Sequence, residues 1–141
     1  MKVIFLDIDG VLNNHFDYQT YGFEYIDSGL VEILKTIVVA TGSEIVISST
    51  WRLNENDLSL VRANLRYKKL DYIDITPDLR KLPRAEEIKS WLKNNPQVIK
   101  YAILDDNEDA GSGLDGFFKT DYYVGLTNEI AEKVINYLNN N

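Results

Sequence analysis

The chain has no cysteine among its 141 residues, which excludes disulfide bridges, thiolate metal sites and thiol nucleophiles. It also lacks any run close to the roughly 20 apolar residues that a membrane-spanning helix needs. The apolar stretch near the N-terminus is too short for a signal peptide and ends at Asp7. We therefore expect a cytoplasmic protein with no membrane partner.

Histidine and positive charge are scarce as well. His15 is the only histidine, so a Ser-His-Asp triad would have to use it, and no nucleophile-elbow motif supports one. The net charge is -7, which gives little nonspecific affinity for nucleic acid. This weakens an interpretation as a free-standing nucleic-acid binder, but it leaves room for an enzyme with a local basic patch.

Apolar segments alternate in a strand-helix order. Helices are predicted from Asp27 or Ser28 to about Thr41, after Asn54, after Pro83 and after Thr127. Strands are predicted at residues 2–7, 44–48, 72–75 and 101–105, and a last short one within 117–124. This alternation favours an α/β fold in three layers, a Rossmann-like parallel sheet with helices on both faces. We expect a single domain over residues 1–141, with residues 11–27 as a small flap insertion.

Two aspartate clusters follow apolar runs. Asp7 and Asp9 come after the first predicted strand, and Asp105 and Asp106 come after the fourth. Ligands of open α/β sheets bind beyond the carboxyl ends of the strands. If these strands are neighbours, the four carboxylates converge, and their repulsion calls for a cation such as Mg²⁺. Taken alone, Asp-x-Asp-Gly is also typical of a turn or a calcium loop. An acidic pair such as Asp105-Asp106 is, taken alone, also typical of a solvated loop.

Hydroxyl groups follow the second predicted strand. Ser48 and Ser49, with Thr50, can hold a phosphoryl oxygen, although helix capping is the commoner role for such serines. Arg52 can bind a substrate phosphate, or its stem can pack beside Trp51 on the surface.

A basic residue is expected at the start of the helix that follows Pro83. From the first turn of that helix, the Arg84 side chain could reach the aspartates and stabilise phosphoryl oxygens. Lys81 competes for this role, and either residue could equally be a solvated member of a loop.

The order of these motifs resembles the haloacid dehalogenase (HAD) superfamily of phosphohydrolases, and the resemblance covers nearly the whole chain. It is carried by Asp7-Ile8-Asp9-Gly10-Val11, by a strand ending at Ser48, by Arg84 and by Leu104-Asp105-Asp106. The segments Ile47–Arg52 and Gly125-Leu126-Thr127 look closest to a HAD group associated with nucleic-acid repair proteins.

The resemblance implies a role for each matched residue. Asp7 resembles the nucleophile that forms an aspartyl-phosphate, and Asp9 resembles the general acid/base. Ser48 resembles the phosphate-binding hydroxyl and Arg84 the basic residue, a position where the family more often has lysine. Asp105 and Asp106 resemble the metal-binding pair, and Asp7 with the backbone carbonyl of Asp9 would complete the Mg²⁺ shell. Ser49, Arg52 and Lys81 are candidate substrate ligands.

HAD proteins usually insert a cap domain, but segments 11–27 and 53–83 are too short for a large one. The site should therefore be open to a bulky phosphate ester such as a nucleic-acid end. Aromatic residues of the flap could stack on a base, or they could form a small core of their own, which we favour. The alternatives are a small nucleotide or metabolite phosphatase, a catalytically silent domain that binds phosphate or a partner, and a CheY-like receiver. The receiver fits less well, because the acidic pairs lie at the two extremes of the chain.

Overall fold

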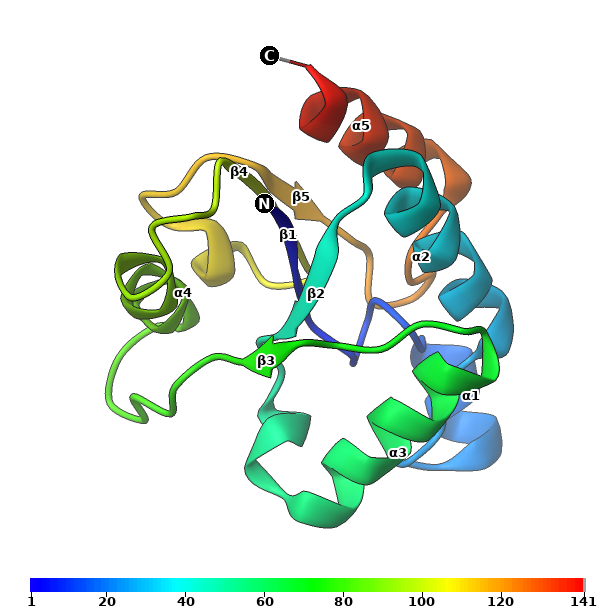
Figure 1. Ribbon diagram of the computed structural model, residues 1–141. Helices are drawn as coiled ribbons and strands as arrows, with labels where there is room; N and C mark the ends of the chain where they lie inside the picture. Colours follow the sequence, from blue (N-terminus) through cyan, green and yellow to red (C-terminus); the bar gives the residue numbers. More distant parts are fainter. Residues whose placement is uncertain (141) are drawn as a thin grey trace.

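The computed structural model, which describes residues 1–140, contains a five-stranded sheet in the order β3-β2-β1-β4-β5. All four strand pairings are parallel. Figure 1 shows β1 in the middle of the sheet, between β2 and β4. The strands are β1 Lys2–Leu6, β2 Glu44–Ile47, β3 Asp74–Ile75, β4 Lys100–Asp105 and β5 Phe117–Lys119.

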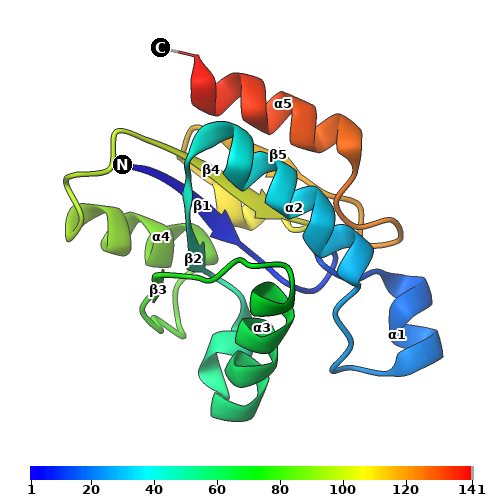
Figure 2. The same ribbon diagram turned by 45° about the vertical axis from the view of Figure 1, so that its right-hand side comes forward.

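Helices cover both faces of the sheet, as the alternating pattern predicts. Helices α2 (Ser28–Thr41) and α5 (Asn128–Asn139) lie side by side on one face, and α3 (Glu55–Tyr67) packs into the same core. Helix α4 (Arg84–Lys93) covers the opposite face (Figures 1 and 2). The three-layer α/β architecture is thereby confirmed.

The central strand β1 is buried on both sides, as parallel strands are. Ile4 and Leu6 pack into the core under α2 and α5, whereas Val3 and Phe5 pack into the core under α4. Because alternate side chains enter different cores, the strand is fixed in register and in the direction it faces. Asp7, the next residue, is thus delivered to a defined point at the carboxyl edge of the sheet.

The helix boundaries follow the capping residues in the sequence. The side chains of Asp27, Asn54 and Thr127 accept hydrogen bonds from the first turns of α2, α3 and α5. Gly42 ends α2 with a φ of 67°, a conformation that suits glycine. Pro83 directly precedes α4.

Three short helical segments lie outside these expectations. The flap, residues 11–27, contains α1 (His15–Tyr21), whose first turn is capped by the side chain of Asn14. The 3₁₀ helices η1 (Thr50–Leu53) and η2 (Glu108–Gly111) follow β2 and β4. All three are too short to show the apolar periodicity that reveals the longer helices.

The strand predicted within 117–124 is wrong beyond Lys119. Residues 122–124 form a turn, because Asp121 accepts hydrogen bonds from the backbone N–H groups of Tyr123, Val124 and Gly125. Segments 11–27 and 53–83 hold α1, the end of η1, α3 and β3, so no large cap domain is present in residues 1–140. Within the same residues, none of the helices has the length and apolarity required to span a bilayer.

Candidate active site at the carboxyl edge of the sheet

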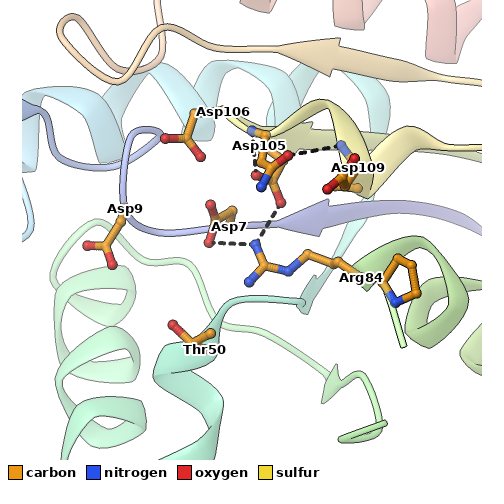
Figure 3. A pocket seen from close by; sticks show the side chains of 10 residues that line it. Asp7, Asp9, Thr50, Arg84, Asp105, Asp106 and Asp109 are labelled. Atoms are coloured by element: carbon orange, nitrogen blue, oxygen red, sulfur yellow. Dashed lines mark hydrogen bonds and ion pairs between the residues drawn. The ribbon is translucent and has the colours of Figure 1, made fainter. Parts of the chain in front are cut away.

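Asp7 and Asp105 meet because their strands are neighbours. The backbone N–H of Asp7 donates to the carbonyl of Leu104 at 3.0 Å, which extends the β1–β4 ladder by one step. Beyond this edge lies a pocket of about 370 Å³ (Figure 3). Its lining residues are Asp7, Asp9, Thr50, Pro83, Arg84, Asp105, Asp106, Asn107, Asp109 and Ala110.

Three carboxylates in this pocket are close enough to hold one cation. One oxygen each from Asp7, Asp105 and Asp106 lies within 4.8 Å of the others. Carboxylate oxygens are the ligands that Mg²⁺ prefers, so the chemistry of this donor set fits the ion. Both oxygens of Asp105 already accept hydrogen bonds, from Arg84 and from the backbone of Asn107. Asp106 is the more accessible member of the pair.

Arg84 crosses from α4 to this cluster. Its Nη1 lies 2.8 Å from Oδ2 of Asp105 and 3.3 Å from Oδ1 of Asp7 (Figure 3). Lys81 is exposed and does not line the pocket. Of the two candidate basic residues, Arg84 is therefore the one beside the aspartates.

Burial and like charge govern the electrostatics of the cluster. Asp7 is only 5% exposed, and burial followed by repulsion from Asp105 raises its pKa well above the ordinary value, although Arg84 acts in the opposite direction. Burial and the nearby Asp105 likewise raise the pKa of Asp106. Burial opposes the charge of Arg84, but attraction from Asp7 and Asp105 outweighs it and raises the pKa of the guanidinium. The site has an excess of negative charge that a divalent cation would offset.

The Asp9 side chain is held apart from this cluster by two donors. Its Oδ1 accepts from Nδ2 of Asn13 at 2.9 Å, and its Oδ2 accepts from Nε1 of Trp51 at 3.1 Å. Asn13 also accepts from the backbone N–H of Gly10 at 2.9 Å and donates to the carbonyl of Tyr25. The carboxylate of Asp9 is thus exposed to the pocket and fixed in direction.

The chain turns at Gly10 under a steric requirement. Gly10 has a φ of 79°, and a Cβ there would lie 2.4 Å from Oδ2 of Asp106. Its carbonyl accepts from the hydroxyl of Thr120 at 2.6 Å. Glycine therefore allows the Asp7–Asp9 turn and Asp106 to occupy adjacent space.

The serines after β2 do not line the pocket, whereas Thr50 does. Ser48 is fully buried, and its Oγ has no hydrogen-bond partner among residues 1–140. Ser49 is buried too and caps η1 by accepting from the backbone N–H of Trp51 at 3.2 Å. The expected capping role thus falls to Ser49, and Thr50 is the exposed hydroxyl residue at the pocket.

Arg52 is neither at the pocket nor on the surface. It is buried, with Nη2 2.7 Å from Oε2 of Glu87, and it also donates to the carbonyls of Ser49, Thr76 and Pro77. These acceptors take four of its five N–H donors, so the guanidinium ties η1 to α4 and to the segment before it. The predicted packing on the surface is therefore wrong, and Arg52 does not line the aspartate pocket, where a phosphate contact was expected.

Sequence reasoning missed Asn13, Trp51 and Asp109 as members or supports of the site. Asn13 lies four residues after Asp9, and a short polar side chain at that distance could have indicated a loop-closing contact. The bond from Trp51 to Asp9 spans 42 residues and leaves no local signal. Asp109 lies three residues after Asp106 and lines the pocket too, but its place in a run of acidic residues does not distinguish it from a solvated residue.

The comparison with known families agrees with this geometry. The family model described as "HAD domain in Swiss Army Knife RNA repair proteins" matches residues 3–131. No curated protein and no solved structure matches the chain. The matched segment covers nearly the whole sequence and every residue of the pocket. The chain therefore belongs to the HAD superfamily, in the family of HAD domains of Swiss Army Knife RNA repair proteins.

Proposed function

We propose that the protein is a magnesium-dependent phosphatase that hydrolyses a phosphate monoester at a nucleic-acid end through an aspartyl-phosphate on Asp7. The observation that carries this proposal is the position of Asp7, which lines the pocket between Arg84 and the Asp105–Asp106 pair. A nucleophilic carboxylate needs a nearby positive charge to approach a phosphate dianion, and Arg84 supplies one. Membership of a HAD family in RNA repair proteins supports both the reaction class and the substrate class.

The donor set fits Mg²⁺, since three carboxylate oxygens lie within 4.8 Å of one another. Asp7, Asp105 and Asp106, with the backbone carbonyl of Asp9, would hold the ion. When bound, it would neutralise charge on the phosphoryl oxygens and on the aspartates.

In the first step, a carboxylate oxygen of Asp7 attacks phosphorus, and the bond from phosphorus to the leaving oxygen breaks. Asp9, protonated, gives its proton to that oxygen as the alcohol departs. Arg84 holds the phosphoryl oxygens and keeps the nucleophile and the transferring group together.

In the second step, Asp9 takes a proton from water, and the water oxygen attacks phosphorus. The acyl-phosphate bond breaks, which releases inorganic phosphate and restores the Asp7 carboxylate. The bonds from Asn13 and Trp51 keep the Asp9 carboxylate directed for both transfers.

An open site suits a bulky substrate, and residues 1–140 contain no large cap. A small nucleotide or metabolite phosphatase is the alternative within the same chemistry. A silent phosphate-binding or partner-binding domain is the alternative outside it, and the fixed direction of Asp9 favours catalysis over silence.

The test measures inorganic phosphate released from 3′- and 5′-phosphorylated RNA and DNA oligonucleotides, and from sugar and nucleotide monophosphates, with Mg²⁺ or with EDTA. We expect repeated turnover of at least one oligonucleotide with Mg²⁺ alone, and none by Asp7→Asn. Activity on the small esters only would replace the nucleic-acid substrate with a metabolite. No turnover on any ester, or a single labelling event per chain without further turnover, would refute the phosphatase.

A further inference from the structure

A second hollow adjoins the pocket on the side of Asp9. Its volume is about 250 Å³, and it shares Asp9 and Thr50 with the aspartate pocket. The complete lining is Asp9, Phe23, Glu24, Thr50, Trp51 and Asp57. The flap thus borders the hollow on one side, and η1 and the start of α3 border it on the other.

Phe23 offers an aromatic surface at this hollow. Its side chain is 74% exposed, and its ring meets that of Tyr18 edge to face, with the centroids 4.7 Å apart. Single exposed apolar side chains are common, so the exposure alone decides nothing. The position of Phe23 is more informative, because its ring lines the same hollow as Asp9, the proposed proton donor.

The charges of the two neighbouring hollows differ. The hollow beside Phe23 carries the carboxylates of Glu24 and Asp57 and is lined by no lysine or arginine among residues 1–140. A third hollow, which shares Thr50, is lined by three arginines, Arg52, Arg80 and Arg84, against two carboxylates, those of Asp78 and Glu87. A phosphate group is repelled from the hollow beside Phe23 and is better accommodated near the arginines of the third hollow. An uncharged ring with N–H donors suits the hollow beside Phe23.

We propose that the hollow beside Phe23 is the leaving-group subsite and takes the terminal nucleoside of the substrate, with its base stacked on Phe23. This inference rests on the proposed function, in which the leaving oxygen must face Asp9. The nucleoside attached to that oxygen then lies in the hollow that Asp9 lines. Glu24 and Asp57 accept hydrogen bonds from the base or the sugar, and their charge keeps further phosphates out of this hollow.

The test compares two oligonucleotides that carry the same terminal phosphate, one with a base on the last nucleotide and one abasic there. Stacking of one base on one aromatic ring changes affinity by roughly 5-fold to 150-fold. We expect wild type to hydrolyse the base-bearing end with a kcat/KM about 10-fold higher than the abasic end, mainly through KM. In Phe23→Ala this ratio should fall to about 1, while Phe23→Tyr should keep it.

Phe16→Ala is the matched control, since Phe16 is a similarly exposed ring (66%) of the same flap but lines neither hollow. In Phe16→Ala, the ratio of kcat/KM for the base-bearing end to kcat/KM for the abasic end should equal that of wild type. An unchanged ratio in Phe23→Ala, or the same loss in Phe16→Ala, would overturn the subsite while leaving the phosphatase intact.

A binding measurement separates a failure of the Phe23 subsite from a failure of the proposed function. Wild type in EDTA is titrated with a phosphorylated oligonucleotide that carries 2-aminopurine at its end, and stacking is read as fluorescence quenching. Quenching by wild type and Phe16→Ala, but not by Phe23→Ala, supports the subsite even without turnover. Equal quenching by all three refutes it.

Discussion

Nη1 of Arg84 donates a 2.8 Å hydrogen bond to Oδ2 of Asp105, and this contact joins the first turn of α4 to the end of β4. The same nitrogen lies 3.3 Å from Asp7. A single guanidinium thus contacts two buried carboxylates that otherwise repel each other at close range.

Replacing Arg84 should abolish most of the activity. We expect Arg84→Ala to lower kcat about 100-fold or more, because removing one preorganised charge at a phosphoryl group has an effect of this order. Arg84→Lys should recover part of the loss, since an ammonium is a point charge without the fork of a guanidinium. The measurement is steady-state hydrolysis of an aryl phosphate with Mg²⁺.

Lys81→Ala provides the control for this series, because Lys81 is a nearby cation outside the pocket. Its kcat should stay within about 2-fold of wild type. A larger loss in Lys81→Ala than in Arg84→Ala would reverse the assignment of the basic residue.

Asp7→Asn should be inactive but more stable than wild type at neutral pH in EDTA. The raised pKa of Asp7, caused by burial and then by Asp105, means that the folded state holds this proton more tightly than the unfolded state. Stability is therefore lost as the pH rises from about 3.8 through the raised pKa, and an uncharged amide avoids that loss. The gain in melting temperature should vanish below about pH 4.

With Mg²⁺, the melting temperature of wild type should exceed that of Asp7→Asn, which is the reverse of their order in EDTA. A cation that binds the folded state raises its melting temperature, and the removal of one of its carboxylate ligands weakens that effect. Thermal unfolding with EDTA and with Mg²⁺ measures both shifts. An equal shift by Mg²⁺ in wild type and Asp7→Asn would remove Asp7 from the metal site.

Gly10→Ala should damage both stability and activity. The new Cβ would lie 2.4 Å from Oδ2 of Asp106 and would sit on a backbone with a φ of 79°. The strained φ alone costs about 1–2 kcal/mol, and displacement of Asp106 adds to it. Gly42→Ala, at a φ of 67° with no atom within 4 Å of the new Cβ, isolates the backbone contribution. Urea unfolding should show a larger loss in Gly10→Ala, and similar losses in both variants would argue against the steric contact.

The sequence predicts those parts of the site that depend on one strand each. An apolar run that ends in aspartate identifies both Asp7 and Asp105, and parallel topology then brings the ends of such strands to one edge. The capping residues Asp27, Asn54 and Thr127 likewise identify the starts of α2, α3 and α5. In each case the information lies within a few residues.

The remaining features depend on partners far along the chain. Arg52 is 35 residues from Glu87, and the Ser-Thr-Trp-Arg segment alone does not indicate whether its guanidinium turns inward. Helix α1 depends on the cap at Asn14 rather than on an apolar stripe, so its pattern resembles that of a loop. Sequence reasoning therefore finds the aspartates but not the network that positions Asp9 and η1.

Arg52→Ala tests the internal role of Arg52. The side chains of Arg52 and Glu87 are 2% and 9% exposed, and removing one partner of such a buried pair costs about 3–5 kcal/mol. We expect a correspondingly lower free energy of unfolding in urea, and a similar loss in Glu87→Ala. If Arg52→Ala instead kept its stability and raised KM for phosphate esters, Arg52 would be a substrate ligand after all.

Asp17→Asn should stabilise the flap at neutral pH. Asp17 is 3% exposed, its Oδ2 has no hydrogen-bond partner among residues 1–140, and burial followed by repulsion from Asp27 raises its pKa. The folded state is therefore weakened as the pH rises from about 3.8 through the raised pKa, and the asparagine variant is spared this loss. We expect a higher melting temperature than that of wild type at pH 7, because only wild type has to bury a charge at this position. At pH 3 both proteins are uncharged at this position, so the difference should disappear there. A gain of the same size at both pH values would mean that the carboxylate charge is not its cause.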